Sequence, residues 1–194
     1  LTLRAVPSTL AGEVTTAAAS MIEEARAVTE ATGSDLAPYV ALDLAALRGS
    51  PAEVSALFDA TTREVTLRGE GLGLTVAEWA DAVLNNGLGC YQQAMTAAQA
   101  ATTDPQPFAA VGSNWALVEL VEAAARSGMN QTAADALHQL TEITSASGTD
   151  WALAVEARSR ALLSEGEAAE RLYRDSITRL GRTRLRLELA RAHL

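Results

Sequence analysis

The sequence predicts an all-α fold, specifically a tetratricopeptide-like α-solenoid of about five helical hairpins. Alanine, the best helix former and a poor strand former, accounts for 41 of the 194 residues. Apolar residues recur at helical spacing along the chain, and regularly spaced glycines divide the pattern into units of 37 to 40 residues. A compact helical bundle is the runner-up architecture.

Each of the regularly spaced glycines ends one helical pattern and precedes another. Glycine is favoured at the C-terminus of a helix because it enters the left-handed backbone conformation at little cost. The spacings of 37, 40, 39 and 38 residues predict one helical hairpin per unit. These glycines are Gly12, Gly49, Gly89, Gly128 and Gly166.

Helix start signals add to the periodicity. Ser50 stands at an N-cap position before Pro51, and Glu53 follows where a capping box requires it. Thr75 and Glu78 form a second capping box. The pattern places ten helices, near residues 9–32, 35–48, 51–68, 75–87, 90–103, 108–127, 130–147, 150–165, 167–180 and from 182 onward.

Two of these helices are apolar around most of their circumference and carry only a narrow polar stripe. They contain Trp79 and Trp115, and the third tryptophan, Trp151, lies 36 residues further on. Such a helix suits a position between neighbours, with its stripe facing the concave side of a superhelix. We therefore expect a groove that binds a cationic peptide segment or a hydroxyl-rich small molecule. The predicted groove residues are Glu78, Asp81, Asn85, Glu119, Glu122 and Arg126.

The charge distribution argues against nucleic acid and anionic lipid as partners of this chain. The formal net charge is −9, although residues 151–194 carry a net +3 from nine arginines. These arginines are interleaved with acidic residues, so we expect them to pair with acids or to dock a neighbouring domain. The single cysteine, Cys90, and the lack of a long apolar run or leader are typical of a cytoplasmic chain without membrane contact.

No pattern of residues predicts catalysis, a cofactor or a metal. The glycine-rich stretch 69–75 lacks a preceding strand and a lysine, so we interpret it as a turn between repeats, not as a phosphate loop. His138, His193 and Cys90 have no partners at ligand or catalytic spacing. The acidic pairs of the two stripes fit a solvated polar stripe better than a hydrolytic acid–base pair.

Four segments closely resemble the middle region of large LuxR-type transcriptional regulators. The first contains Gly69-Glu70-Gly71-Leu72-Gly73-Leu74-Thr75, Trp79-Ala80 and Asn86-Gly87-Leu88-Gly89. The other three are residues 147–153, 165–174 and 180–194. The resemblance implies one helical-repeat domain over residues 1–194, cut from a longer chain. The start at Leu1 and the end at Leu194, inside a helical pattern, agree with this expectation.

Regulators of this kind carry an N-terminal nucleotide-binding domain of the signal-transduction ATPase class and a C-terminal helix-turn-helix. The resemblance therefore implies a non-catalytic segment that senses an inducer or partner protein, with ATP and DNA bound by other domains of the parent chain. A free-standing tetratricopeptide-type adaptor that binds peptides is the alternative, and an all-α enzyme is a third possibility. Open reading frame on both sides of this segment distinguishes the first two.

Overall fold

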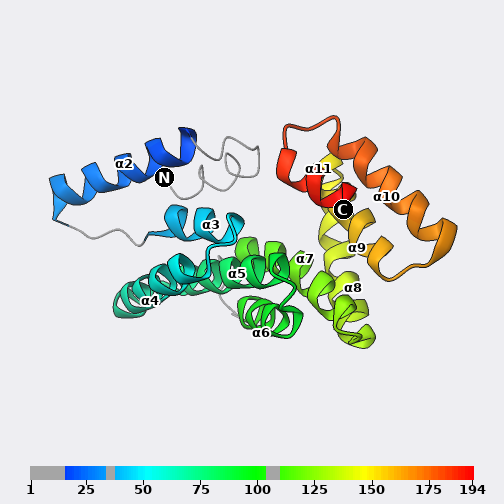
Figure 1. The fold of residues 1–194 in the computed structure, drawn as a ribbon, viewed down its shortest axis with the longest axis horizontal. Coiled ribbons are helices and arrows are strands. Elements are labelled where there is room, and N and C mark those ends of the chain that lie inside the picture. Colours follow the sequence, from blue (N-terminus) through cyan, green and yellow to red (C-terminus); the bar gives the residue numbers. More distant parts are fainter. Residues whose placement is uncertain (1–15, 34–37, 104–109) are drawn as a thin grey trace.

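A computed structural model describes residues 16–33, 38–103 and 110–194, and the part that it describes is all-α, as predicted. Ten helices and no strand occur in these ranges (Figure 1). The start of the first expected helix, and Gly12 with it, lie outside the described residues. The helices are α2 (Thr16–Thr32), α3 (Tyr39–Leu47), α4 (Pro51–Arg68), α5 (Gly71–Gly87), α6 (Tyr91–Thr102), α7 (Ala110–Arg126), α8 (Asn130–Ser147), α9 (Asp150–Leu162), α10 (Gly166–Leu180) and α11 (Arg186–His193).

The repeat glycines mostly sit where helices end. Gly49, Gly89 and Gly128 follow α3, α5 and α7 with φ of +67°, +73° and +74°, in the left-handed region that a side chain resists. Gly166 differs, because it is the first residue of α10 and has a φ of +55°. The N-cap of α4 is Ser50 with Pro51 in the first helical position, as the sequence predicts.

One predicted start is wrong: α5 begins at Gly71, four residues before the predicted capping box at Thr75. The glycine-rich stretch is therefore mostly helix, and Thr75 lies inside it with its hydroxyl 3.5 Å from the carbonyl oxygen of Gly71. Gly69 does form a turn, because it ends α4 with a φ of +68°, whereas Gly73 is needed for packing. A Cβ at Gly73 would lie 2.3 Å from Tyr39 Oη and 2.4 Å from Val65 Cγ1.

The Gly73→Ala variant is expected to lose about 1–3 kcal/mol of unfolding free energy, because the added methyl overpacks the crossing of α3, α4 and α5. Urea denaturation followed by circular dichroism measures this loss. Gly87→Ala is the matched control, since a Cβ at Gly87 meets nothing within 4 Å. Equal stability of the two variants would contradict the packing role of Gly73.

The helices pack in a series in which each helix from α3 to α11 contacts the next. Helices α3, α5, α7 and α9 also contact one another in turn, so alternate helices form a continuous layer. Small side chains fill much of the core between them, including Ala82, Ala94, Ala123 and Ala133. Alanine at these contacts lets helix axes approach closely, which explains the composition.

The C-terminal end of the chain turns back over this series (Figure 1). Helix α11 lies beside α9, and it reaches α7 through side chains 72 residues apart in sequence. Just before and within α11, Leu185 and Leu187 pack against the buried cluster that contains Trp79 and Ala116. Because α11 returns to the middle of the series, it covers part of the alternate-helix layer.

Helix α3 carries a buried carboxyl group at Asp43, which is 3% exposed. Neither carboxyl oxygen has a hydrogen-bond partner in the described part of the chain. Burial without a partner raises the pKa of Asp43 to about 8, so the group is largely protonated at neutral pH.

Stability is expected to fall as pH rises from about 4 to about 8, because the folded chain retains a proton on Asp43 that the unfolded chain has already released. Replacing Asp43 with asparagine removes this titration. The Asp43→Asn variant should therefore gain about 4–5 kcal/mol over the wild type between pH 4 and pH 8. Denaturation at both pH values measures the change, and the exposed Asp59→Asn variant controls for lost charge. A constant difference between Asp43→Asn and wild type would contradict the assignment.

Candidate functional site

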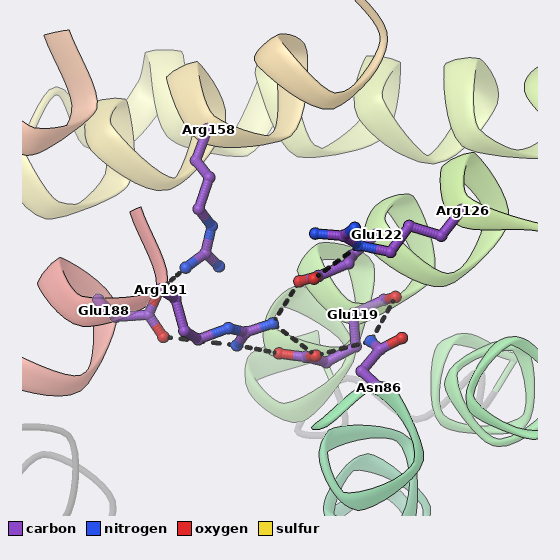
Figure 2. Close-up of polar contacts among 7 residues, drawn as sticks. All are labelled: Asn86, Glu119, Glu122, Arg126, Arg158, Glu188 and Arg191. Carbon is purple, nitrogen blue, oxygen red and sulfur yellow. Dashed lines mark hydrogen bonds and ion pairs between the residues drawn. The ribbon is translucent and has the colours of Figure 1, made fainter. Parts of the chain in front are cut away.

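The polar stripe of α7 is largely buried. Glu119 is only 2% exposed, and Glu122 is half-buried. Figure 2 shows that both side chains point toward α11. A carboxylate removed from water in this way needs charged or hydrogen-bonding partners, and the chain supplies them from two other helices, α5 and α11.

The main partner is Arg191 of α11. Its Nη1 and Nη2 donate to the two carboxylate oxygens of Glu119 at 2.7 and 2.9 Å, and Nη2 also donates to Glu122 Oε2 at 2.7 Å. This planar, two-pronged geometry is the one that favours arginine over lysine. The stripe that the sequence predicts to bind a cationic segment therefore holds the chain's own arginine.

Helix α5 contributes Asn86 from the opposite side. Its Nδ2 donates to Glu119 Oε2 at 2.9 Å and to the Glu119 backbone carbonyl at 3.0 Å. Asn86 is 8% exposed, so this bridge ties α5 to α7 in a buried position. It also orients the Glu119 carboxylate toward Arg191 (Figure 2).

A second buried ion pair joins α9 to α11. Arg158 Nη1 lies 2.9 Å from Glu188 Oε2, and the two side chains are 4% and 9% exposed. Glu188 Oε1 also lies 3.8 Å from Arg191 Nη1, which connects the two pairs. We call the connected group the clasp: Asn86, Glu119, Glu122, Arg126, Arg158, Glu188 and Arg191 (Figure 2).

The charges of the clasp balance, with three carboxylates against three guanidiniums. Burial by itself raises the pKa of Glu122, but attraction to Arg191, Arg158 and Arg126 outweighs it, so the pKa is lowered. Burial by itself lowers the pKa of Arg191, but Glu119 and Glu188 reverse that effect and hold the pKa above its usual value. Both groups are charged at neutral pH, so the clasp is ionic.

The remaining predicted groove residues have other neighbours. Arg126 pairs with Glu122 at 3.2 Å and places its guanidinium 5.6 Å from the ring centre of Tyr91 on α6. On α5, Asn85 Nδ2 donates to the Asp81 carboxylate at 3.0 Å. In the described part of the chain, no hydrogen bond or ion pair joins Glu78, Asp81 or Asn85 to the stripe of α7. The structure thus brings Glu119, Glu122 and Arg126 together and leaves the stripe of α5 apart.

The pKa values of the two α5 carboxyls reflect this separation. Burial, followed by repulsion from Asp81, raises the pKa of Glu78. Burial also raises the pKa of Asp81, while the hydrogen bond from Asn85 partly offsets it. Neither carboxyl has an arginine partner comparable to Arg191 in the described residues.

A cavity of about 190 Å³ lies next to the clasp, between α5, α7, α8, α9 and α11. All three tryptophans of the chain line it, and so do Glu119 and Glu188 of the clasp. Trp79 and Trp115 pack against each other with ring centres 5.5 Å apart and planes tilted by 50°. The cavity wall is therefore mainly apolar, with three indoles among aliphatic side chains and with paired charged groups at its edge.

Sequence reasoning missed Asn86, Arg158 and Glu188. Each is a polar residue on the buried side of its helix, and this is the signal that points to a hidden partner. The predicted pairing of the C-terminal arginines with acids is confirmed for several of them. Arg179, for example, contacts Asp175 at 2.9 Å and Asp150 at 3.4 Å.

The described residues offer little support for a metal site or for a site built on histidine. No group of three or more histidine, cysteine, aspartate or glutamate side chains there is placed to hold a metal ion. His138 lies on the surface, with Nε2 3.9 Å from a carboxylate oxygen of Glu142. None of the helices in the described ranges combines the length and apolar character needed to cross a membrane.

Comparison with protein-family models, curated proteins and solved structures finds no match to this chain.

Proposed function

We propose that this chain is a non-catalytic regulatory and protein-interaction segment whose concave surface receives a short cationic helix. The observation that carries the proposal is the seating of α11, which places Arg191 on Glu119 and Glu122. Long charged side chains hold this helix together with the apolar contacts of Leu187, Leu189 and Ala192, and a partner helix of similar pattern would compete with it for the same surface.

The contacts between alternate helices support this function. We propose that α3, α5, α7 and α9, which contact one another in turn, are the first helices of stacked hairpins in a solenoid. In a tetratricopeptide-like superhelix, these first helices line the concave side. The tryptophans, and all residues of the clasp except Glu188 and Arg191 of α11, lie on α5, α7 and α9, so a superhelix of this kind would place them on that side.

The proposed setting is a LuxR-type transcriptional regulator, on the strength of the sequence resemblance in segments 69–89, 147–153, 165–174 and 180–194. In that setting the partners are the other domains of the parent chain and an inducer, and the chain works in the cytoplasm. ATP would bind a different domain, and this segment would contact neither DNA nor membrane. A nucleotide-binding motif encoded upstream and a helix-turn-helix downstream would distinguish this setting from a free-standing adaptor.

The state of the carboxylates favours binding over catalysis. A general acid or base needs a carboxyl that can exchange its proton with a reacting group. Glu119 and Glu122 are instead neutralised by Arg191, and Glu188 by Arg158. These paired carboxylates hold α11 in the groove, so removing one of them should change how often α11 occupies it.

A peptide-binding experiment tests the groove. A dye-labelled peptide with the sequence of residues 183–194 is titrated into the wild type and into Arg191→Gln, with fluorescence anisotropy as the readout. In the wild type, the chain's own α11 competes at high effective concentration. The variant weakens that competitor, so the peptide should bind it at least about 10-fold more tightly.

Two controls sharpen the result. A peptide with glutamine in place of the Arg191 equivalent should bind the variant more weakly than the parent peptide, because it cannot pair with Glu119. The Arg174→Gln chain removes an exposed ion pair outside the clasp and should behave like the wild type. Equal affinity for wild type and Arg191→Gln, or no binding to either, would overturn the proposal.

A further inference from the structure

We propose that the tryptophan-lined cavity binds an uncharged aromatic molecule of one ring that carries a hydrogen-bond acceptor. The inference extends the sensing part of the proposed function by naming a ligand class. It is tested on the cavity itself, whereas the peptide assay tests the groove. Either test is therefore able to fail without the other.

Size and lining set the ligand class. The cavity is about 190 Å³, and an apolar cavity of about 150 Å³ is large enough to hold one benzene molecule. Trp79, Trp115 and Trp151 present three indoles, and aromatic rings prefer tilted or offset contact with such groups. A single aromatic ring with a small substituent matches both the volume and the walls.

The charged groups at the cavity edge favour a neutral ligand. Glu119 is engaged by Arg191 and Asn86, and Glu188 is engaged by Arg158 and Arg191. A cation or an anion entering the cavity would lose its hydration and gain no unpaired counter-charge from these groups. An uncharged molecule avoids that cost.

Several polar groups of the wall are also engaged. Thr144 Oγ1 donates within α8 and contacts the Glu156 carboxylate, while Thr149 Oγ1 accepts from the backbone N–H of Ala152 at 3.2 Å. Trp151 differs, because its indole N–H is buried and has no hydrogen-bond partner in the described part of the chain. A carbonyl oxygen on the ligand would satisfy this donor once the indole turns its N–H toward the cavity, and buried donors normally require such a partner.

The tryptophans provide a selective readout, because all three in the chain line this cavity. Acetophenone, which is neutral and carries one carbonyl acceptor, is titrated into the ¹⁵N-labelled chain. The three indole N–H signals are followed by NMR, and the Trp151→Phe variant assigns the signal of Trp151. We expect saturable shifts with a Kd of about 0.1–1 mM, with the Trp151 signal moving downfield.

Two further probes test the ligand class. Ethylbenzene has the ring but no acceptor, and benzoate has the ring with a negative charge. Both should bind at least about 5-fold more weakly than acetophenone. Ethylbenzene binding as tightly as acetophenone would overturn the role of the Trp151 N–H, and equal binding of benzoate would overturn the preference for an uncharged molecule.

A cavity-filling variant tests the location. Ala152→Leu adds side-chain volume to the wall and should abolish the acetophenone shifts, whereas Ala134→Leu on the exposed side of α8 should leave them unchanged. If Ala152→Leu does not fold by circular dichroism, Ile143→Phe fills the same cavity from α8. Shifts that persist in a folded filled variant, or the absence of saturable shifts in the wild type, would overturn the site.

Discussion

Replacing Glu119 with alanine is expected to lower the free energy of unfolding by about 3–5 kcal/mol. The substitution leaves the Arg191 guanidinium without its main partner in a position where the side chain is only 21% exposed. It also removes one of the two acceptors of the buried Asn86 amide, which keeps only the backbone carbonyl of residue 119. A buried charge that loses its main partner accounts for most of the large effect, and the weakened amide adds to it.

The measurement is urea denaturation of four chains: wild type, Glu119→Ala, Arg191→Ala and the double variant. Because the two groups form one pair, the double variant should lose clearly less than the sum of the single losses. Glu142→Ala serves as the control, since Glu142 is 72% exposed and its contact with His138 is 3.9 Å long. A loss below about 1 kcal/mol for Glu119→Ala, or strict additivity, would show that the clasp does not stabilise the fold.

The helices were predictable because their signals are local. Apolar spacing, alanine content and the glycines at helix ends act over a few residues, and the described helices fall close to the predicted ranges. The start of α5 was predicted wrongly because a glycine-rich stretch usually indicates a turn. Gly73 is instead selected by Tyr39 and Val65, which belong to other helices and are invisible to a local pattern.

The candidate site was predictable only in part, and for the same physical reason. The stripe of Glu119, Glu122 and Arg126 follows from helical spacing, and its acidic character predicts a cationic occupant. That the occupant is Arg191 depends on the return of α10 and α11 over the series, a tertiary property that no spacing encodes (Figure 1). The bridging amide belongs to Asn86, not to the neighbouring Asn85, because the buried face of α5 meets α7 there.

The clasp and the cavity share helix α11, and this links the two proposals structurally. Glu188 lines the cavity while it pairs with Arg158, and Leu187 packs against the cluster of Trp79. A helix that is fixed by Arg191 on one side and borders a cavity on the other responds to changes at either. Occupancy of the cavity and release of the helix would therefore influence each other through Glu188 and Leu187.

Replacing Trp79 with alanine is the other change with a large expected effect, a loss of about 3–5 kcal/mol of unfolding free energy. Trp79 is 6% exposed, contacts Trp115 and packs with Ala101 and Ala116. It thus joins α5 to α6 and α7 and forms one wall of the cavity. The neighbouring alanines have too little side chain to fill the space left by the indole. Repacking should therefore recover little of the unfolding free energy lost through the new cavity.

Thermal unfolding followed by circular dichroism measures the loss, which should lower Tm by about 8–15 °C for a chain of this size. Trp79→Phe keeps a ring in the same place and should lose less than half as much as Trp79→Ala. Leu67→Ala is the control for removing an apolar side chain from α4, because Leu67 is 78% exposed. If Trp79→Ala and Leu67→Ala unfold at similar temperatures, the tryptophan cluster is not a structural core. If Trp79→Phe is as unstable as Trp79→Ala, the fit of the indole to Trp115, and not its apolar volume, holds α5 against α7.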